Sequence, residues 1–148
     1  MNKLIRNPIT NAIGLAVLSG FYGLMFLGFS DAIVSQAGQS KEAFWVQWDC
    51  FLVAGGHRTL ACLMLVLTAV VIVYLRIRHK PYDEYHVSIL VNCLVTALVL
   101  TLAALAAFFV VIVSDSAGAI GKYAFFIALN WTVVVFSNLI YLLICAKR

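Results

Sequence analysis

The chain has 148 residues, 64% of them hydrophobic and only 11% charged, with a formal net charge of +4. Soluble domains carry about 45–50% apolar and about 25% charged residues, so this composition excludes an ordinary water-soluble protein. The basic residues form short clusters at the ends of apolar runs, which argues against a nucleic-acid-binding surface. We expect a single domain, residues 1–148, that lies in a lipid bilayer.

Four apolar runs are long enough to cross a bilayer, whose core of about 30 Å needs about 20 helical residues. They cover about 9–34, 57–77, 86–113 and 119–146. Lipid offers no partners to backbone polar groups, so each run is predicted to be an α-helix. The expected fold is all-α, an integral membrane four-helix bundle.

The first run follows Lys3 and Arg6, as the apolar region of a signal peptide would. It is longer than the usual 7–15 residues of such a region, so we expect an uncleaved span. Small residues recur along it at a spacing that favours close approach of another helix, at Ala12, Ala16, Gly20 and Gly28, with Ser19 and Gly23 beside this row.

The segment of about 40–54, between the first two runs, carries Phe44, Trp48 and Phe51 at helical spacing. An aromatic helix face is typical of the membrane–water boundary. We expect a short amphipathic helix on the outer surface that ends at Gly55 and Gly56. The alternative is an extension of the second span through these two glycines.

Several polar and aromatic side chains gather near this outer segment. Arg58 is predicted to pair with Asp31, Asp49 or Asp115, or else to bind an anionic head group or ligand. The candidates for an outer ligand or head-group site are Asp31, Trp45, Trp48, His57 and Arg58.

The loop after the second span is strongly basic, with Arg76, Arg78 and Lys80. Basic loops favour the cytoplasmic side, so both chain termini are predicted to be cytoplasmic, in a membrane that we take to be a prokaryotic plasma membrane. Asp83 then follows as a helix cap for the third span. The neighbouring tyrosines and acids could instead dock a cytoplasmic partner.

Asp, Glu, Lys and Arg are confined to the loops and the ends of the spans, and amides take their place inside. Folding the third and fourth spans into a hairpin puts Asn92 and Asn138 at one depth, and we predict a hydrogen bond between them. The fourth span has a polar edge for packing or for lining a path, made of Asn130, Ser137, Asn138 and Tyr141.

Catalytic and cofactor motifs are missing. His57 lies near one membrane face and His79 and His86 near the other, which does not suit a haem, and the cysteines show no C-x-x-C spacing. No metal or cofactor is predicted, and an enzyme is not expected.

Three functions remain from the sequence. The preferred one is a non-catalytic subunit or scaffold that packs against a larger membrane partner. The second is a small transporter or channel formed by a homo-oligomer, and the third is a lipid- or quinone-binding membrane protein. The expected partners are therefore the bilayer and a membrane protein, and no nucleic acid.

Overall fold

The computed structural model describes residues 7–28, 30–36, 42–77 and 83–146, and its regular elements are all helical. In chain order they are α1 (Pro8–Gly28), α2 (Ser30–Gln36), α3 (Ala43–Phe51), the π-helical η1 (Leu52–Gly56), α4 (His57–Ile77), α5 (Glu84–Ser114) and α6 (Ala119–Ala146). Four helical stretches are long and apolar enough to cross a membrane, which confirms the expected all-α membrane fold: α1, α3 to α4, α5 and α6.

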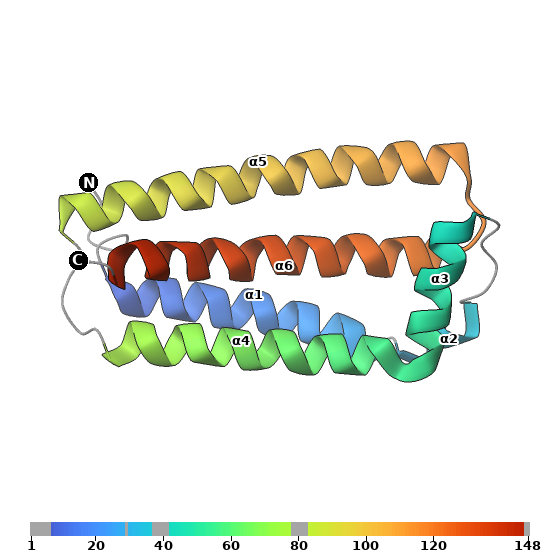
Figure 1. The fold of residues 1–148 in the computed structure, drawn as a ribbon, viewed down its shortest axis with the longest axis horizontal. Coiled ribbons are helices and arrows are strands. Elements are labelled where there is room, and N and C mark those ends of the chain that lie inside the picture. The colour runs from blue at the N-terminus through green and yellow to red at the C-terminus, as the bar shows by residue number, and fades with distance from the viewer. Residues whose placement is uncertain (1–6, 29, 37–41, 78–82, 147–148) are drawn as a thin grey trace.

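The helices are arranged around α6, which lies between α5 on one side and the pair α1 and α4 on the other (Figure 1). α6 contacts α1, α2, α3, α4 and α5, whereas α5 packs chiefly on α6. One end of the molecule carries α2 and α3, and we call it the α3 end. The opposite end carries the last turn of α4 and the first turn of α5, and we call it the Arg76 end.

Within the predicted run 9–34, the first described helix is α1, Pro8–Gly28. Its 21 residues rise about 31 Å, which matches the bilayer core without the residues that follow. Ser30–Gln36 forms the separate helix α2 at the α3 end, and Asp31 lies in its first turn.

The packing face of α1 differs from the predicted row of small residues. Its buried side chains include Ala12, Ser19 and Gly23, and a Cβ built on Gly23 would lie 3.5 Å from Leu65 and 3.7 Å from Trp131. Gly20 has open space around it. Ser19 and Gly23, which lie beside the predicted row, therefore form the close contact with α4 and α6.

The segment before the second span combines the two predicted alternatives. α3 lies across the α3 end of the molecule, as expected for an interfacial helix (Figure 1). The chain nevertheless stays helical into α4, with one break at Gly55, where φ is 88°. Glycine tolerates this left-handed conformation, so Gly55 sets the direction change between α3 and α4.

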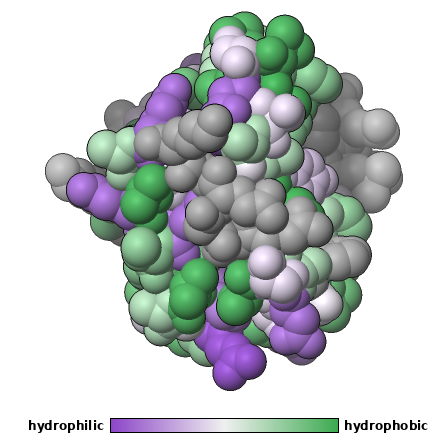
Figure 2. Space-filling model, turned by 90° about the vertical axis from the view of Figure 1, so that its right-hand side faces the viewer, coloured by the Kyte–Doolittle hydropathy of each residue, from purple (hydrophilic) through white to green (hydrophobic). Residues whose placement is uncertain are grey.

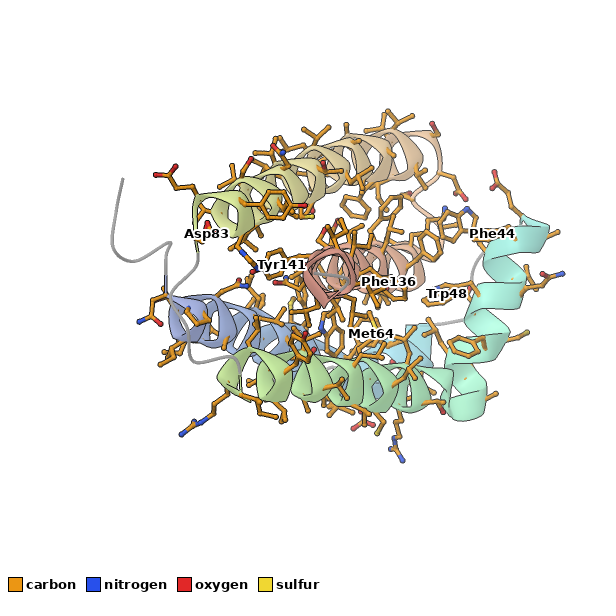
Figure 3. The ribbon with its side chains drawn as sticks, turned by 60° about the vertical axis from the view of Figure 1, so that its left-hand side comes forward. Phe44, Trp48, Met64, Asp83, Phe136 and Tyr141 are labelled. Carbon is orange, nitrogen blue, oxygen red and sulfur yellow. The ribbon has the colours of Figure 1, made fainter. Side chains whose placement is uncertain are left out.

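α3 buries a different face from the aromatic row Phe44, Trp48 and Phe51, for which only a place at the membrane–water boundary was expected. Trp45 and Asp49 are buried, whereas Phe44 and Phe51 are exposed. The reason is that α3 packs on the beginning of α6, where Phe125 makes edge-to-face contacts with the rings of Trp45 and Trp48. Figure 3 shows Trp48 turned from α3 toward the other helices.

Candidate functional site

A buried polar cluster joins α1, α4 and α6. Trp131 Nε1 donates a hydrogen bond of 3.1 Å to Ser19 Oγ, and Thr68 Oγ1 lies 2.9 Å from the same oxygen. Thr68 Oγ1 also lies 2.8 Å from the carbonyl oxygen of Met64. We call Ser19, Thr68 and Trp131 the Ser19 cluster. No sequence pattern singles it out, because these residues lie on three helices and none is charged.

Asn138 does not pair with Asn92, and this prediction was wrong. Its Oδ1 accepts a hydrogen bond of 3.2 Å from Asn11 Nδ2 on α1, and its Nδ2 donates to the carbonyl oxygen of Val134 at 2.9 Å. Asn92 is exposed on α5. Counting residues from the turn places side chains at one depth, but it does not fix the face of α6 that α5 covers.

The side chains of the predicted polar edge of α6 lie in different environments. Asn138 and Tyr141 are buried, and Tyr141 belongs to the hydrophobic core at the Arg76 end (Figure 3). Asn130 is half-buried, and its Oδ1 has no hydrogen-bond partner among the described residues. Ser137 is half-buried and lies beside α5. These side chains therefore form no single polar surface.

A shallow groove of about 340 Å³ lies between α5 and α6 and contains Asn92, Thr96 and Ser137. Thr96 Oγ1 donates to the carbonyl oxygen of Asn92 at 2.9 Å, so this hydroxyl is already satisfied. The carboxamide of Asn92 has no hydrogen bond within the described residues. We call this surface the α5–α6 groove.

The structure divides the five predicted outer-face residues into two groups. Asp31, His57 and Arg58 line one pocket of about 460 Å³ between α2 and the Gly55 break, which we call the α2–α4 pocket. Trp45 and Trp48 instead pack on α6. Figure 2 looks onto this end of the molecule, where hydrophilic and hydrophobic side chains are mixed.

Arg58 does not form the predicted ion pair within the described part of the chain. Asp115 instead accepts from Lys122, whose Nζ lies 2.7 Å from both Asp115 Oδ2 and the Asp115 carbonyl oxygen. Asp31 is an exposed residue on α2, and it too has no ion pair among the residues described. Both charges of the α2–α4 pocket are thus available to a ligand.

The contact of α3 with the beginning of α6 is polar as well as aromatic. Trp48 Nε1 donates to the Gly121 carbonyl oxygen at 2.8 Å, and Lys122 Nζ lies 5.7 Å from the centre of the Trp45 ring. Asp49 is buried with its carboxylate against Gly121. We call this contact the α3 anchor. The sequence did not reveal that Lys122 is buried, because it lies near the end of an apolar run, where lysines usually reach water.

Lys122→Met should loosen the turn between α5 and α6. Only 1% of the Lys122 side chain is exposed, whereas 35% of the Asp115 side chain is exposed, so solvent weakens this ion pair. We expect a loss of about 1–3 kcal/mol in the free energy of unfolding. Unfolding of the purified protein in mixed micelles measures it, and an unchanged unfolding midpoint would contradict the assignment.

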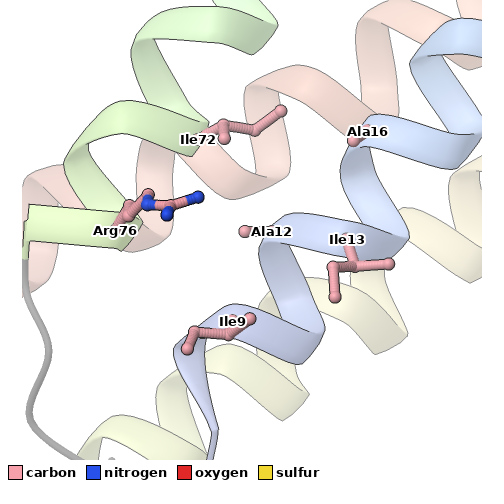
Figure 4. A pocket seen from close by; sticks show the side chains of 6 residues that line it. All are labelled: Ile9, Ala12, Ile13, Ala16, Ile72 and Arg76. Atoms are coloured by element: carbon pink, nitrogen blue, oxygen red, sulfur yellow. The ribbon is translucent and has the colours of Figure 1, made fainter.

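At the opposite end, Arg76 lies over a groove of about 270 Å³ between α1 and α4 (Figure 4). Its guanidinium points across the groove toward Ala12. Asp83 caps α5, because its Oδ1 accepts from the backbone N–H of Tyr85 at 3.2 Å. Arg78 and Lys80, the other two members of the predicted orientation signal, lie outside the described residues.

The described residues contain no group of three or more histidine, cysteine or acidic side chains that could hold a metal ion. Comparison with known proteins supplies no function either. No protein-family model matches the chain, and neither a curated protein nor a solved structure is similar to it.

Proposed function

We propose that this multi-pass membrane protein is a non-catalytic subunit that docks on a membrane partner through α5. Support comes first from how little of α5 the chain itself covers. Only 11% of the most apolar stretch of α5 is buried, compared with 28–33% for the corresponding stretches of the other spans. Lipid alone can cover an apolar helix surface. The polar residues of α5 are therefore what distinguishes a helix that faces lipid from a helix that faces a protein partner.

The single observation that carries the proposal is the exposed carboxamide of Asn92. Asn92 follows Glu84, the first residue of α5, by about 12 Å along the helix axis. The 31 residues of α5 span about 46 Å, so a centred bilayer core of about 30 Å would include Asn92. An amide without a partner in hydrocarbon is costly, and a polar side chain from a neighbouring helix would remove that cost.

A transporter has weaker support from this geometry. Ser19, Thr68, Asn11 and Asn138 hydrogen-bond to groups inside the chain, which leaves them unsuited to solvate a passing polar solute. Asn138, which the oligomeric-channel hypothesis needs on an outer surface, is buried. Loss of solute flux in liposomes on Asn138→Leu would have supported a channel, but the same substitution now also removes the contact with α1.

The docking prediction is tested with Asn92→Leu. A tagged chain purified from its native membrane should bring a second membrane protein with it, and Asn92→Leu should reduce the amount of that protein several-fold. Leu63→Ala, on the exposed face of α4, serves as the control and should have no effect. A chain that leaves the native membrane alone, or a partner equally retained by Asn92→Leu, would contradict the proposal.

The proposed orientation places the Arg76 end in the cytoplasm. Cys50 is exposed on α3 at the other end, so a membrane-impermeant maleimide should label it from outside intact cells. Cys50→Ser should abolish this labelling, which identifies the reacting thiol. Labelling of Cys50 only after the cells are opened would reverse the proposed orientation.

A further inference from the structure

We propose that the α2–α4 pocket binds a phosphoethanolamine group, which carries an ammonium and a phosphate on a short linker. The pocket is formed where the chain leaves regular α-helical geometry. Gly55, with its φ of 88°, lines the pocket at the end of the π-helical segment η1. This break places the first residues of α4 opposite α2.

The α2–α4 pocket has one positive and one negative side chain, which favours a ligand that carries both a negative and a positive charge. Arg58 lies in the first turn of α4, where the helix dipole also favours an anion, and Asp31 lies on α2. Neither has an ion pair within the described part of the chain. A simple anion would be repelled by Asp31 and a simple cation by Arg58, whereas a zwitterion satisfies both.

His57 supplies an acceptor for the ammonium group. His57 is one of the residues that line the pocket although only 3% of it is exposed, and its Nδ1 lies 2.9 Å from the Leu52 carbonyl oxygen. A carbonyl can only accept, so Nδ1 carries a proton, and in the neutral form of the ring Nε2 is left as an acceptor. Nε2 is buried and has no hydrogen-bond partner among the described residues. An N–H group of the ligand would satisfy it.

The size and walls of the pocket fit this group. A volume of about 460 Å³ lies within the range of small-molecule sites. Val34 and Val53 provide apolar contacts for the carbon linker, or for the glycerol end of a lipid. The same chemistry occurs in the head group of phosphatidylethanolamine and in free phosphoethanolamine, and the experiment separates these two sources.

The test compares two lipids that differ only in the ammonium group. The purified protein is placed in nanodiscs of equal parts phosphatidylethanolamine and phosphatidylcholine, and the lipid retained on release is measured by native mass spectrometry. Choline has no N–H donor for Asp31 or His57, so phosphatidylethanolamine should be retained about tenfold more. Equal retention of the two lipids would overturn the inference, unless free phosphoethanolamine binds in their place.

Variants then assign the contacts. Asp31→Asn should remove the preference for ethanolamine over choline, Asp31→Glu should keep it, and Arg58→Gln should lower retention of both lipids. Arg76→Gln, at the other end of the molecule, is the control and should change neither. Wild-type retention by Asp31→Asn and Arg58→Gln would overturn the site.

Free phosphoethanolamine identifies the source. Thermal stabilisation of the wild-type protein by free phosphoethanolamine, lost in Arg58→Gln, would assign the pocket to a soluble ligand. Lipid retention without that stabilisation would assign the pocket to the lipid head group. If neither lipid retention nor stabilisation is observed, the inference is refuted. The purified chain is tested without a partner, so the result is independent of the docking proposed for α5.

Discussion

Gly121→Ala should detach α3 from the beginning of α6. A Cβ at Gly121 would collide with Oδ1 of the buried Asp49, so the Asp49 carboxylate, and α3 with it, would have to shift. That movement would also break the hydrogen bond from Trp48 Nε1 to the Gly121 carbonyl oxygen. Overpacking of this kind costs about 1–3 kcal/mol, and the lost hydrogen bond adds to it.

The measurement is unfolding in mixed micelles together with limited proteolysis near α3. Gly121→Ala should unfold more easily and be cleaved faster, because α3 is released. Gly20→Ala is the matched control, since nothing lies within 4 Å of a Cβ built on Gly20. Alanine favours a helix over glycine by about 1 kcal/mol, so this control should be neutral or stabilising. Equal effects of the two substitutions would refute the α3 anchor.

Ser19→Ala should have the second large effect, because removal of one hydroxyl takes a hydrogen-bond partner from two helices, α4 and α6. Trp131 Nε1 and Thr68 Oγ1 both lie within hydrogen-bonding distance of Ser19 Oγ. Thr68 can still donate to the Met64 carbonyl oxygen, whereas the indole N–H of the fully buried Trp131 loses its acceptor, Ser19 Oγ. We expect a loss of about 1–3 kcal/mol.

A double-mutant cycle separates this hydrogen bond from the effects of volume. Trp131→Phe removes the donor and some volume, so alone it should also be destabilising. With Trp131→Phe in place, Ser19→Ala should cost less than it does in the wild-type chain, with a coupling of about 0.6–2 kcal/mol. Additive effects of the two substitutions would show that the Ser19 cluster does not act as a unit.

The sequence predicts the number and type of the spans because run length and composition determine them. A bilayer demands about 20 apolar helical residues, and four runs meet that demand. The ends of the spans depend on local geometry. The first run, 9–34, for example, contains two described helices, α1 over Pro8–Gly28 and α2 over Ser30–Gln36.

Side-chain partners across the bundle were harder to predict, because helical spacing gives depth but not the facing helix. Asn138 faces Asn11 on α1 and not Asn92 on α5. The same limit applies to α3, whose aromatic residues surround the helix. Only the position of α6 selects Trp45 for burial in place of Phe44.

The candidate pocket was partly accessible from the sequence. Asp31, His57 and Arg58 were grouped because all three lie near the outer ends of spans, and the structure places them around one pocket. Arg58 does not pair with Asp115, because Asp115, in the turn between α5 and α6, forms its ion pair with Lys122. The role of Gly55 in forming the pocket required its backbone conformation.

The central position of α6 has a consequence for biosynthesis. α6 is the last of these helices in chain order, yet α1, α2, α3, α4 and α5 all contact it. During insertion, α1 and α4 can pack against each other, whereas α5 lacks its main packing partner until α6 has been synthesised. A chain that stops at the turn after α5 would therefore leave the ribosome with its helices inserted but without the element that joins them.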